Sequence, residues 1–548
     1  MSDNESGTDP HAQVGELERG FRPTTPLKIA LDEVARAAGA SDPSALVPDV
    51  VVSGVCLDSR AVQAGDLYAA LPGGHTHGAR FAAQAQQRGA VAVLTDTEGA
   101  GLMGDLADLP VIVVEDPRSV LGSVSQTVYN SAELAPTTYA VTGTNGKTTT
   151  TYMLRHLLSS AGETTGLIGT IEILAGDTAI PSVLTTPESP QLHGLMSRMG
   201  QAGVTTAAME VSSHSLSFQR VAGLHFAVSG FTNLTQDHLD LHGSMEEYLA
   251  AKAELFTPRY SRAAVVTVDD EWGQSLARTS RGVGVPTATL STGHGAGGAA
   301  GSADYVVTDV VRQGLGTAFV LLGPDELRIE ARTGLPGSFN VSNAALALSM
   351  LLVGGMDPDA LSQLLNADPE ALTPQVPGRM QVVHHRPTAV VDFAHNPDAL
   401  VRALDSLEVS GGRRIVVFGA TGERDTTKRP IMGALAAQHA DVVIVTDDDP
   451  HDEDPARIRA QVAAGARDAG AEATVLEVAP RARAIRAAVA LADPDDVILV
   501  AGRGHEVFQE VAGVNLSLDD REELAKAFAA ESGERGSAAA DGVGSTQS

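Results

Sequence analysis

The sequence has only one cysteine, Cys56, among its 548 residues. A single cysteine excludes an internal disulfide and any metal site built from several cysteines. Because free cysteines in proteins usually behave as small hydrophobic residues, we expect Cys56 to lie in a core and not to act as a nucleophile.

Positively charged residues are also in short supply. The chain has 38 lysines and arginines against 68 aspartates and glutamates, so its formal net charge is 38 − 68 = −30. Such a charge disfavours long-range attraction to nucleic acid or to an anionic membrane, and we expect neither partner. If the ligands are anionic phosphates, the site must concentrate its few basic side chains locally.

Long hydrophobic runs are missing as well. The longest apolar stretch, about residues 344–354, is too short to cross a bilayer and contains Ser349. The first residues, Met1–Ser6, are acidic and lack the apolar segment of a signal peptide. These features predict a cytoplasmic protein without membrane insertion.

The length predicts several domains, because 548 residues exceed one comfortable core. Alternating strand-like and helical stretches predict an α/β protein of three domains: a small α/β N-terminal domain, a central parallel-sheet domain and a C-terminal Rossmann-like domain. We place them at residues 26–136, 137–377 and 378–530. The polar ends, residues 1–25 and 531–548, are expected to be disordered.

Short apolar runs bounded by turn residues predict the strands. In the first two domains they fall at 50–55, 91–95, 165–171, 205–211, 226–232 and 263–268, with a hairpin at 306–311 and 317–322. In the third domain they fall at 388–393, 414–418, 442–446 and 497–500. The glycine- and alanine-rich stretch 295–303 is expected to be a surface loop.

Each of the four strands predicted in the third domain is followed at once by polar, turn-forming residues. These segments are residues 394–398, 419–425, 447–451 and 502–506. In open α/β sheets ligands bind in the crevice outside the carboxyl ends of the strands. Four charged strand ends therefore predict a ligand site in the third domain.

The most informative stretch is Gly143-Thr-Asn-Gly-Lys-Thr-Thr149, between a β-branched run and a helical pattern. A strand, a glycine-rich turn and a helix N-terminus favour phosphate, with Lys147 reaching the β- and γ-phosphates and Thr148 touching Mg²⁺. The usual P-loop has a glycine where this chain has Val141, so the match is incomplete. The alternative is an ordinary turn between a strand and a helix.

Two later strand ends carry further candidates for this site. Magnesium needs hard oxygen ligands beyond Thr148, and Glu210 follows a predicted strand. His238 lies in the acidic turn Asp237–Asp240 and could serve a second metal, although imidazole is an unusual magnesium ligand. The alternative for His238 is a capping or core histidine.

Seven motifs occur in order along residues 50–530, and together they resemble the Mur ligase family. They are Gly143-Thr-Asn-Gly-Lys-Thr-Thr149, Thr185-Thr-Pro187, Glu210-Val-Ser-Ser-His214, Asn233 with Asp237-His-Leu-Asp240, Gly337-Ser-Phe-Asn-Val-Ser-Asn343, Pro377-Gly-Arg379 and Asp392-Phe-Ala-His-Asn-Pro-Asp398. With so many motifs in the same order, the probability of a chance similarity is very small. The missing P-loop glycine then becomes a variant of the family.

The resemblance implies an ATP-dependent amide ligase that adds the third peptide residue to UDP-N-acetylmuramoyl-L-alanyl-D-glutamate. ATP phosphorylates the free carboxylate, and an amino acid then displaces phosphate. The implied catalytic residues are Lys147, Glu210, His238 and Lys252. In the family a carbamylated lysine completes a two-metal site, so the implied metal ligands are Thr148, Glu210, His238 and carbamylated Lys252. Without the resemblance, Lys252 reads as a surface helix lysine.

The same resemblance assigns the binding residues and predicts a monomer. The ATP site comprises Gly143, Thr144, Asn145, Gly146, Lys147, Thr148, Thr149, Asn340 and Arg379. The first domain holds the uridine nucleotide through Leu57 and Ser59, and the muramoyl-peptide meets Thr185, Thr186, Ser212 and Arg220. Arg379 joins the last two domains, which implies domain closure; equal radii of gyration in solution scattering with and without ligands would contradict closure.

The third domain is expected to bind the incoming amino acid through Arg424, Asp448, Asp449, His451, Gly502 and Glu506. Family members that add diaminopimelate carry Asp-Asn-Pro-Arg where this chain has Asp448-Asp-Pro-His451. An arginine suits the far carboxylate of diaminopimelate, whereas an acidic pocket suits the ammonium of lysine. The substitutions therefore predict L-lysine. The alternative is meso-diaminopimelate, because Gly502 and Glu506 match family positions that contact the far end of diaminopimelate.

Two other functions compete with this interpretation. Folylpolyglutamate synthetase shares the P-loop style and the last two domains, but it lacks a uridine-nucleotide domain. A non-enzymatic nucleotide-binding scaffold would have no reason to align Glu210, His238 and four charged strand ends. ATP turnover without a carboxylate or amine substrate would favour the scaffold.

Overall fold

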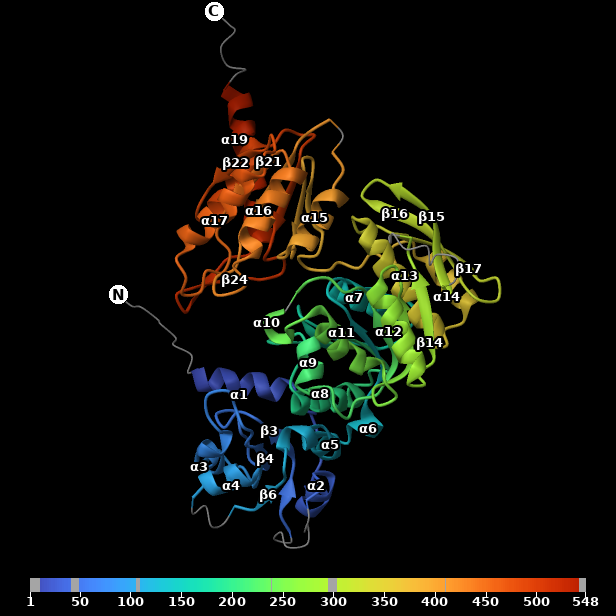
Figure 1. Cartoon of the computed structure of the whole chain (residues 1–548), viewed down its shortest axis with the longest axis vertical. Coiled ribbons are helices and arrows are strands. Elements are labelled where there is room, and N and C mark those ends of the chain that lie inside the picture. The colour runs from blue at the N-terminus through green and yellow to red at the C-terminus, as the bar shows by residue number, and fades with distance from the viewer. Residues whose placement is uncertain are drawn as a thin grey trace, which may run out of the picture.

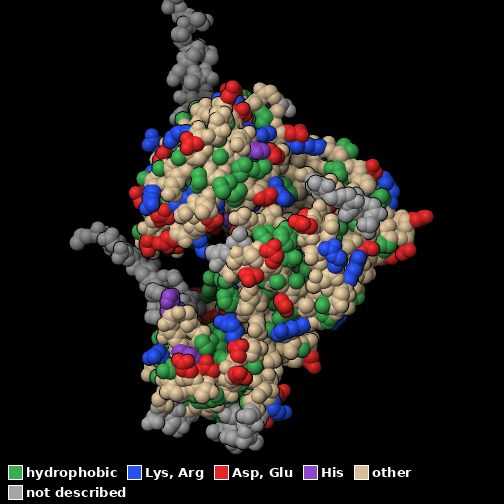
Figure 2. All heavy atoms as spheres, in the orientation of Figure 1, with side chains coloured by type: hydrophobic (Ala, Val, Ile, Leu, Met, Phe, Trp, Pro, Cys, Tyr) green, Lys and Arg blue, Asp and Glu red, His purple; other side chains and the backbone are tan. Residues whose placement is uncertain are grey.

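The computed structural model describes residues 10–40, 49–104, 109–237, 239–293, 303–409 and 411–541. Three α/β domains follow one another along the long axis, with the first at one end and the third at the other (Figure 1). On the face shown in Figure 2, acidic and basic side chains are mixed over all three domains. Within the described residues, no helix is long and apolar enough to cross a membrane.

The first domain has a four-stranded parallel sheet whose strands lie in chain order, β3–β4–β5–β6. A separate antiparallel pair joins β1 to β2. The strands are β1 Ile29–Ala30, β2 Val51–Val52, β3 Gly54–Cys56, β4 Asp66–Ala69, β5 Ala92–Thr95 and β6 Val111–Val113. The helices are α2 Leu31–Ala37, η2 Gly78–Phe81, α3 Ala82–Gln87, α4 Thr97–Leu102, α5 Pro117–Tyr129 and α6 Ser131–Leu134. Cys56 is buried in the core, as predicted.

The central domain is built on an eleven-stranded sheet of order β10-β9-β8-β11-β7-β12-β13-β14-β15-β16-β17. The middle strands are parallel and both edges are antiparallel. Its strands are β7 Thr137–Thr142, β8 Thr165–Ile168, β9 Ile173–Ala175, β10 Thr178–Ile180, β11 Thr206–Glu210, β12 Phe226–Phe231, β13 Ser261–Thr267, β14 Thr287–Ser291, β15 Tyr305–Gln313, β16 Gly316–Leu322 and β17 Arg328–Thr333. Its helices are α7 Lys147–Ser160, α8 Ser189–Gln201, α9 Ser213–Ser217, α10 Leu239–His242, α11 Met245–Ala253, η3 Glu254–Phe256, α12 Glu271–Gly282, α13 Ser338–Val353 and α14 Pro358–Ala367.

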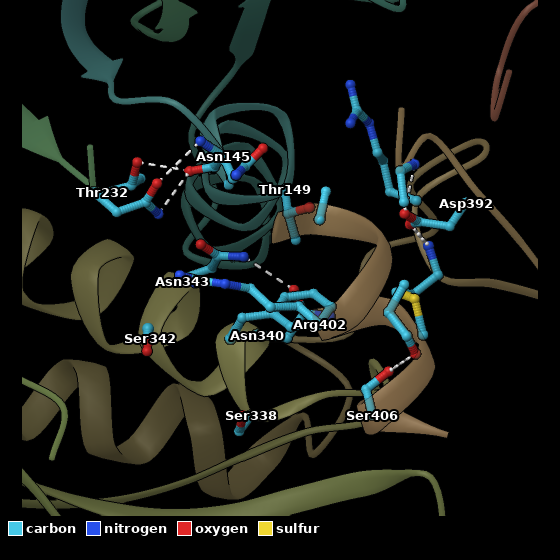
Figure 3. Close-up of a pocket in the computed structure, with 18 of the residues that line it drawn as sticks. Asn145, Thr149, Thr232, Ser338, Asn340, Ser342, Asn343, Asp392, Arg402 and Ser406 are labelled. Carbon is cyan, nitrogen blue, oxygen red and sulfur yellow. Dashed lines mark hydrogen bonds between the residues drawn. The ribbon is translucent and has the colours of Figure 1, made fainter. Parts of the chain in front are cut away.

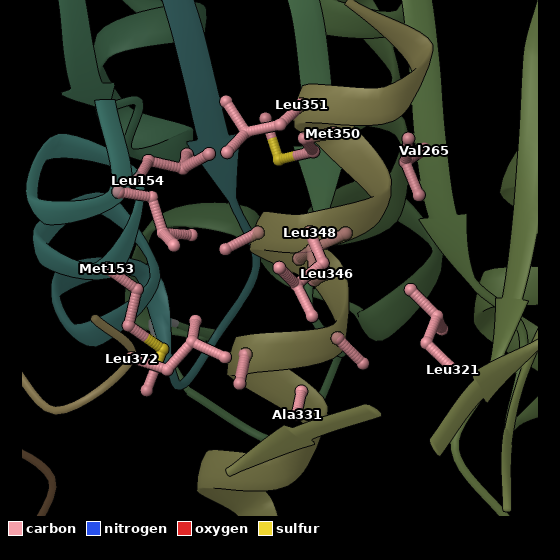
Figure 4. Packing of buried hydrophobic residues seen from close by; sticks show 14 of the residues in the cluster. Met153, Leu154, Val265, Leu321, Ala331, Leu346, Leu348, Met350, Leu351 and Leu372 are labelled. Carbon is pink, nitrogen blue, oxygen red and sulfur yellow. The ribbon is translucent and has the colours of Figure 1, made fainter. Parts of the chain in front are cut away.

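Helix α13 contains the longest apolar stretch of the sequence and runs through the core of the central domain (Figure 4). Leu346, Leu348 and Met350 are fully buried in the same cluster as Met153 of α7 and Val265 of β13. A helix that is apolar on all sides must be covered on all sides. With the helix packed in this way, Asn343 near the N-terminal end of α13 lies against Gly146 of the P-loop.

The third domain has a six-stranded sheet of order β18-β19-β23-β20-β21-β22, parallel from β19 onward. The strands are β18 Gln381–His385, β19 Thr388–Asp392, β20 Arg414–Phe418, β21 Val442–Val445, β22 Thr474–Glu477 and β23 Val497–Ala501, and a separate hairpin pairs β24 Phe508–Val511 with β25 Val514–Ser517. The helices are α15 Pro397–Ser406, α16 Lys428–His439, α17 Pro455–Asp468, α18 Arg481–Leu491 and α19 Asp520–Asp541. This order sets the carboxyl ends of β19, β23, β20 and β21 side by side, so the four polar segments that follow these strands gather at one edge of the sheet.

The predicted strands are confirmed except at 50–55, where the run forms two strands, β2 and β3, in different sheets. The prediction of disordered ends was wrong in part. Residues 10–20 form helix α1 (Pro10–Gly20), and Phe21 is buried in the core of the central domain. The Arg22 guanidinium bonds both oxygens of the buried Asp66 carboxylate in the first domain, at 2.6 and 2.8 Å. The partners that order this segment are supplied by distant residues, so its own polar composition could not reveal them.

At the other end, α19 continues to Asp541, beyond the predicted start of disorder at residue 531. Residues 1–9 and 542–548 lie outside the described residues. Of the predicted loop 295–303, only Ala303 is described.

Candidate active site

The turn between β7 and α7 has the geometry of an anion-binding loop. Gly143 and Gly146 have φ angles of 144° and 91°, which favour glycine. A Cβ at Gly143 would overlap the Thr232 hydroxyl, and one at Gly146 would overlap the Asn343 amide. Both glycines are therefore required by conformation and by close approach, and the α7 N-terminus is left open to an anion.

Lys147 is the first residue of α7 and folds back over the loop. Its Nζ donates to the carbonyl oxygens of Gly143 (3.0 Å) and Thr144 (2.9 Å). Burial lowers the pKa of Lys147, and the nearby carboxylates of Glu210 and Asp237 oppose that shift. The ammonium thus lies at the loop, where the phosphates of a nucleotide are expected.

Glu210 ends strand β11, the neighbour of β7, and is only 1% exposed. Its carboxylate accepts hydrogen bonds from the Thr148 hydroxyl (3.0 Å) and from the Thr170 amide (2.9 Å). A carboxylate beside a hydroxyl is a hard-oxygen donor set, so Glu210 and Thr148 fit a magnesium ion. Of the other two predicted ligands, His238 lies outside the described residues, whereas Lys252 lies within them. Within the described residues, no group of three or more His, Cys, Asp or Glu side chains could hold a metal.

The local sequence alone suggested that Lys252 is a surface lysine, but in the structure it is buried. It lies on α11, is 1% exposed, and its Nζ donates to the Gly143 carbonyl at 3.0 Å. The same Nζ lies 4.3 Å from the ring centroid of Tyr248. Burial, and next the charge of Lys147, lower the pKa of Lys252 well below its usual range. Lys252, which the family resemblance indicated, therefore contacts the P-loop through its side chain.

A cavity of about 590 Å³ opens beside the P-loop, between α13 and the third domain (Figure 3). Asn340 donates from Nδ2 to the Pro336 carbonyl (2.7 Å) and accepts from Asn343 (3.0 Å). Arg379 lines the same cavity, with Nη2 3.5 Å from the Thr148 hydroxyl. Asn145, Gly146 and Thr149 complete its P-loop side. The structure therefore brings five of the nine predicted ATP residues, from two domains, to one cavity, whereas Gly143, Thr144, Lys147 and Thr148 are not among the residues that line it.

The residues predicted to bind the muramoyl-peptide gather around Glu210. Thr185 accepts a hydrogen bond from Thr170, which also contacts the Glu210 carboxylate. Thr186 donates to the Glu210 carbonyl (2.9 Å) and accepts from the Ser212 amide (3.2 Å). The Arg220 guanidinium is 3.3 Å from the Thr186 carbonyl and forms an ion pair with Glu188 at 2.8 Å.

The residues predicted to bind the uridine nucleotide lie in the first domain, away from the P-loop along the long axis of the molecule. Leu57 and Ser59 follow β3 in the first domain, whereas the P-loop precedes α7 in the central domain (Figure 1). The Ser59 hydroxyl donates to Gln84 at 2.8 Å, and Leu57 packs partly buried against the core of the first domain.

Five of the six residues predicted to bind the amino acid follow the carboxyl ends of β21 and β23, and the sixth, Arg424, follows β20. A Cβ at Gly502 would approach the Asp448 carboxylate to 2.7 Å, so these two strand ends touch. Burial, followed by the charges of Asp448 and Asp449, raises the pKa of Glu506 to about 8. The Nδ1 atom of His451 lies 3.1 Å from the Glu510 carboxylate, and Arg424 is exposed in the turn after β20.

Two buried arginines at these strand ends were missed by the sequence analysis. Arg503 is fully buried, pairs with Asp449 and lies 3.5 Å from Glu506. Arg481 is also fully buried, pairs with Asp520 at 2.7 Å and lies 4.0 Å from Asp448. The surroundings of these aspartates are therefore not purely acidic as expected, because Arg503 pairs with Asp449 and Arg481, which is paired with Asp520, lies near Asp448. The segment 502–506 could have signalled Arg503; nothing local marks Arg481.

Three family models match nearly the whole of this arrangement. They describe a Mur ligase family catalytic domain over residues 51–129, a Mur ligase middle domain over 141–351 and a Mur ligase glutamate ligase domain over 378–504. The chain belongs to the Mur ligase family. Mur ligases are ATP-dependent enzymes that form amide bonds, which excludes the non-enzymatic scaffold.

Relatives in the Mur ligase family align along most of their length. The UDP-N-acetylmuramyl-tripeptide synthetase of Leifsonia xyli is 43% identical over 93% of this chain and 98% of its own. The UDP-N-acetylmuramoyl-L-alanyl-D-glutamate–2,6-diaminopimelate ligase of Corynebacterium glutamicum is 43% identical over 92% and 96%. A solved UDP-N-acetylmuramoyl-L-alanyl-D-glutamate–2,6-diaminopimelate ligase matches with a TM-score of 0.63 and 30% identity, over 92% of this chain and all of that one.

More distant solved structures share the Mur ligase fold alone. Folylpolyglutamate synthase of Mycobacterium tuberculosis has a TM-score of 0.54 and 20% identity over 70% of this chain. The family match at residues 51–129 supplies the N-terminal domain that the sequence analysis used to set that enzyme apart.

Proposed function

We propose that the chain joins 2,6-diaminopimelate to the D-glutamate of UDP-N-acetylmuramoyl-L-alanyl-D-glutamate, with conversion of ATP to ADP and phosphate. The supporting observation is that relatives named as 2,6-diaminopimelate ligases align over more than nine-tenths of this chain at 43% identity. The proposed enzyme acts as a cytoplasmic monomer.

This proposal replaces the L-lysine preference predicted from the sequence. That prediction treated Asp448 and Asp449 as free acids facing a cation. In the structure Arg503 pairs with Asp449, and Arg481 lies 4.0 Å from Asp448. The pocket thus carries both signs, which suits the far end of diaminopimelate because that end has an ammonium and a carboxylate. Arg424 remains available in the adjoining turn for the α-carboxylate.

The proposed reaction has two steps. A carboxylate oxygen of D-glutamate attacks the γ-phosphorus of ATP, the bond from γ-phosphorus to the bridging oxygen breaks, and ADP leaves with an acyl phosphate formed. The amino nitrogen then attacks the acyl carbon, the bond from carbon to the phosphate oxygen breaks, and the nitrogen loses a proton. Lys147 and the loop amides lie where negative charge accumulates on the transferring phosphoryl group.

Thr148 and Glu210 would hold Mg²⁺, which screens the phosphate charges when it is bound. Arg379 contacts Thr148 from the third-domain side, and the carboxylates of Asp392, Glu210 and Glu506 raise its pKa against the effect of burial. It is therefore positioned to align the acyl phosphate with the amino-acid end. Burial lowers the pKa of Arg379.

Carbamylation of Lys252 is also proposed. Burial favours its neutral amine, and the amine nitrogen is the atom that attacks the carbon of CO₂, with loss of one proton. The resulting carbamate would be an anion beside Lys147. Wild-type protein in ¹³CO₂-enriched buffer should show a carbamate carbon signal by NMR that Lys252→Arg lacks. Identical spectra for the two proteins would rule the modification out.

The function is tested with purified protein, ATP, Mg²⁺ and the UDP-muramoyl-dipeptide. Phosphate release should require an added amino acid and should respond to meso-diaminopimelate more than to L-lysine, with the product mass confirming the tripeptide. Turnover with lysine alone would overturn the amino-acid assignment but not the ligase chemistry. Phosphate release without any amino acid would count against ligation.

A further inference from the structure

Residues 18–25, which are the end of α1 and the segment after it, form a strap along helix α8 of the central domain (Figure 1). The Gly20 carbonyl accepts a hydrogen bond from the Arg198 guanidinium at 2.9 Å. The Thr25 amide donates to the Gln201 side chain at 3.1 Å, and that side chain donates back to the Thr25 carbonyl at 2.9 Å. Because Arg198 and Gln201 are three residues apart, the strap follows one face of α8.

Two successive residues of the strap are held by two different domains. Phe21 is buried in the central core, and a Cβ at Gly194 of α8 would overlap its carbonyl. The Arg22 side chain reaches the first domain, where it pairs with the fully buried Asp66. A Cβ at Gly54 of β3 would overlap both partners of this pair. The first domain therefore has a built site for the Arg22 guanidinium, and the strap bridges the two domains.

The strap also reaches a residue predicted to bind the muramoyl-peptide. The Gln191 side chain donates to the Glu18 carboxylate at 2.9 Å and accepts from the Glu188 amide at 3.1 Å. Glu188 forms the ion pair with Arg220 at 2.8 Å. The first turn of α8 thus connects the strap to the guanidinium that is expected to meet the peptide.

The first and central domains also meet beside the strap, through α5. The Gln126 side chain of α5 donates to the Gly223 carbonyl at 2.7 Å, and Arg118 of the same helix lies 3.3 Å from Glu188. This second contact should keep the domains attached when the strap is broken. Since one contact leaves freedom to rotate and two contacts remove it, the strap should fix the orientation of the domains.

We propose that the strap fixes the distance between the nucleotide end and the peptide end of the substrate site, and that Arg22 is a positioning residue for the UDP-muramoyl-dipeptide. The inference rests on the proposed function, because it takes one substrate to reach from Leu57 and Ser59 in the first domain to Arg220 in the central domain. A ligand held at two places binds the second place as an intramolecular event, so its affinity depends on the distance between them.

Breaking the strap at either end tests the inference. Arg22→Met removes its bond to the first domain, and Arg198→Met removes a bond to α8. Each should raise KM for the UDP-muramoyl-dipeptide about tenfold and leave kcat within about twofold of wild type, because binding is lost equally in the ground and transition states. The Kd of UDP alone should stay within about twofold, because UDP occupies the first domain only. The double variant should match the weaker single variant within about threefold, because the two contacts act in series.

The matched control is Arg19→Met, which makes the same change at an exposed position of α1 and should leave KM unchanged. Amide hydrogen exchange of β3 and α8 would show whether each variant is folded, and Arg198→Met remains informative if Arg22→Met is not. An unchanged KM in both single variants, a loss of UDP affinity as large as the rise in KM, or single effects that multiply in the double variant would overturn the inference. Wild-type protein that does not turn over the UDP-muramoyl-dipeptide would instead overturn the proposed function.

Discussion

The nucleotide end and the amino-acid end of the site are built by different means. At the nucleotide end, Lys147 and Thr148 are the first residues of helix α7, and Glu210 ends β11, the strand beside β7, where its carboxylate accepts a hydrogen bond from Thr148. At the amino-acid end, Asp448 and Asp449 are matched by Arg481 and Arg503, which arrive from α18 and from the end of β23. The nucleotide end therefore depends on the β7–α7 turn and the strand beside it, whereas the amino-acid end depends on ion pairs between residues that are distant in the sequence.

Burial also acts on opposite charges at the two ends. It lowers the pKa of Lys147 and Lys252 at the nucleotide end, and it raises the pKa of Glu506 to about 8 at the amino-acid end. In each case the desolvated group is pushed toward its neutral form. The comparison teaches that the amino-acid end depends on compensation between charges, whereas the nucleotide end depends on where the backbone places them.

The largest effect is expected from breaking that compensation. Arg481→Met leaves Asp520 fully buried without its partner, and the local stability of β21 and β23 should fall by about 3–5 kcal/mol. Amide hydrogen exchange measures this loss directly, because the slowest amides report the opening of the sheet.

The control for Arg481 is the double variant Arg481→Met/Asp520→Leu, which removes both charges. It should recover most of the lost stability, since replacing a buried pair by apolar groups is often neutral. If the double variant is as unstable as Arg481→Met, packing around Arg481 matters and charge compensation does not. That result would remove the contrast between the two ends.

These two ends also explain what the sequence could and could not predict. The P-loop was predictable because strand, turn and helix are contiguous. The gathering of the four polar segments of the third domain was predictable because each follows a parallel strand directly. The pocket charge was not predictable, because Asp448 is matched by Arg481 from a helix 33 residues later. The burial of Lys252 and the ordering of Arg22 could not be predicted for the same reason, because their partners Gly143 and Asp66 are distant in the chain.

A second prediction concerns the nucleotide end. Lys147→Ala removes the ammonium held by the Gly143 and Thr144 carbonyls, and kcat should fall about 10²–10³-fold because phosphoryl transfer loses a preorganised positive charge. Phosphate release under saturating substrates measures the change, and Lys526→Ala, which alters a 63% exposed lysine on α19, is the control. The amide exchange of β21 and β23 should be unchanged. A protein that loses both activity and exchange protection would show that the two ends are not separable.

The smallest expected effect is a pH dependence at Glu506. Its pKa in the folded protein, about 8, lies above its ordinary value of 4.5, so the folded state binds more protons than the unfolded state between these values. Stability should therefore fall as pH rises from about 4.5 to 8 and change little above that. Glu506→Gln removes this term. It should match wild type at pH 5 and exceed it by about 1 kcal/mol at pH 9, a modest value because the side chain is 35% exposed.

Urea unfolding at the two pH values measures the Glu506 difference, with the exposed Glu472→Gln as the matched control. The comparison between variant and wild type cancels the many other groups that titrate over the same range. If Glu506→Gln is equally stable at both pH values relative to wild type, Arg503 already compensates the ionised Glu506 carboxylate. Charge compensation at the amino-acid end would then extend from Asp449 to Glu506, and the incoming amino acid would meet a pocket whose acids are all paired before it binds.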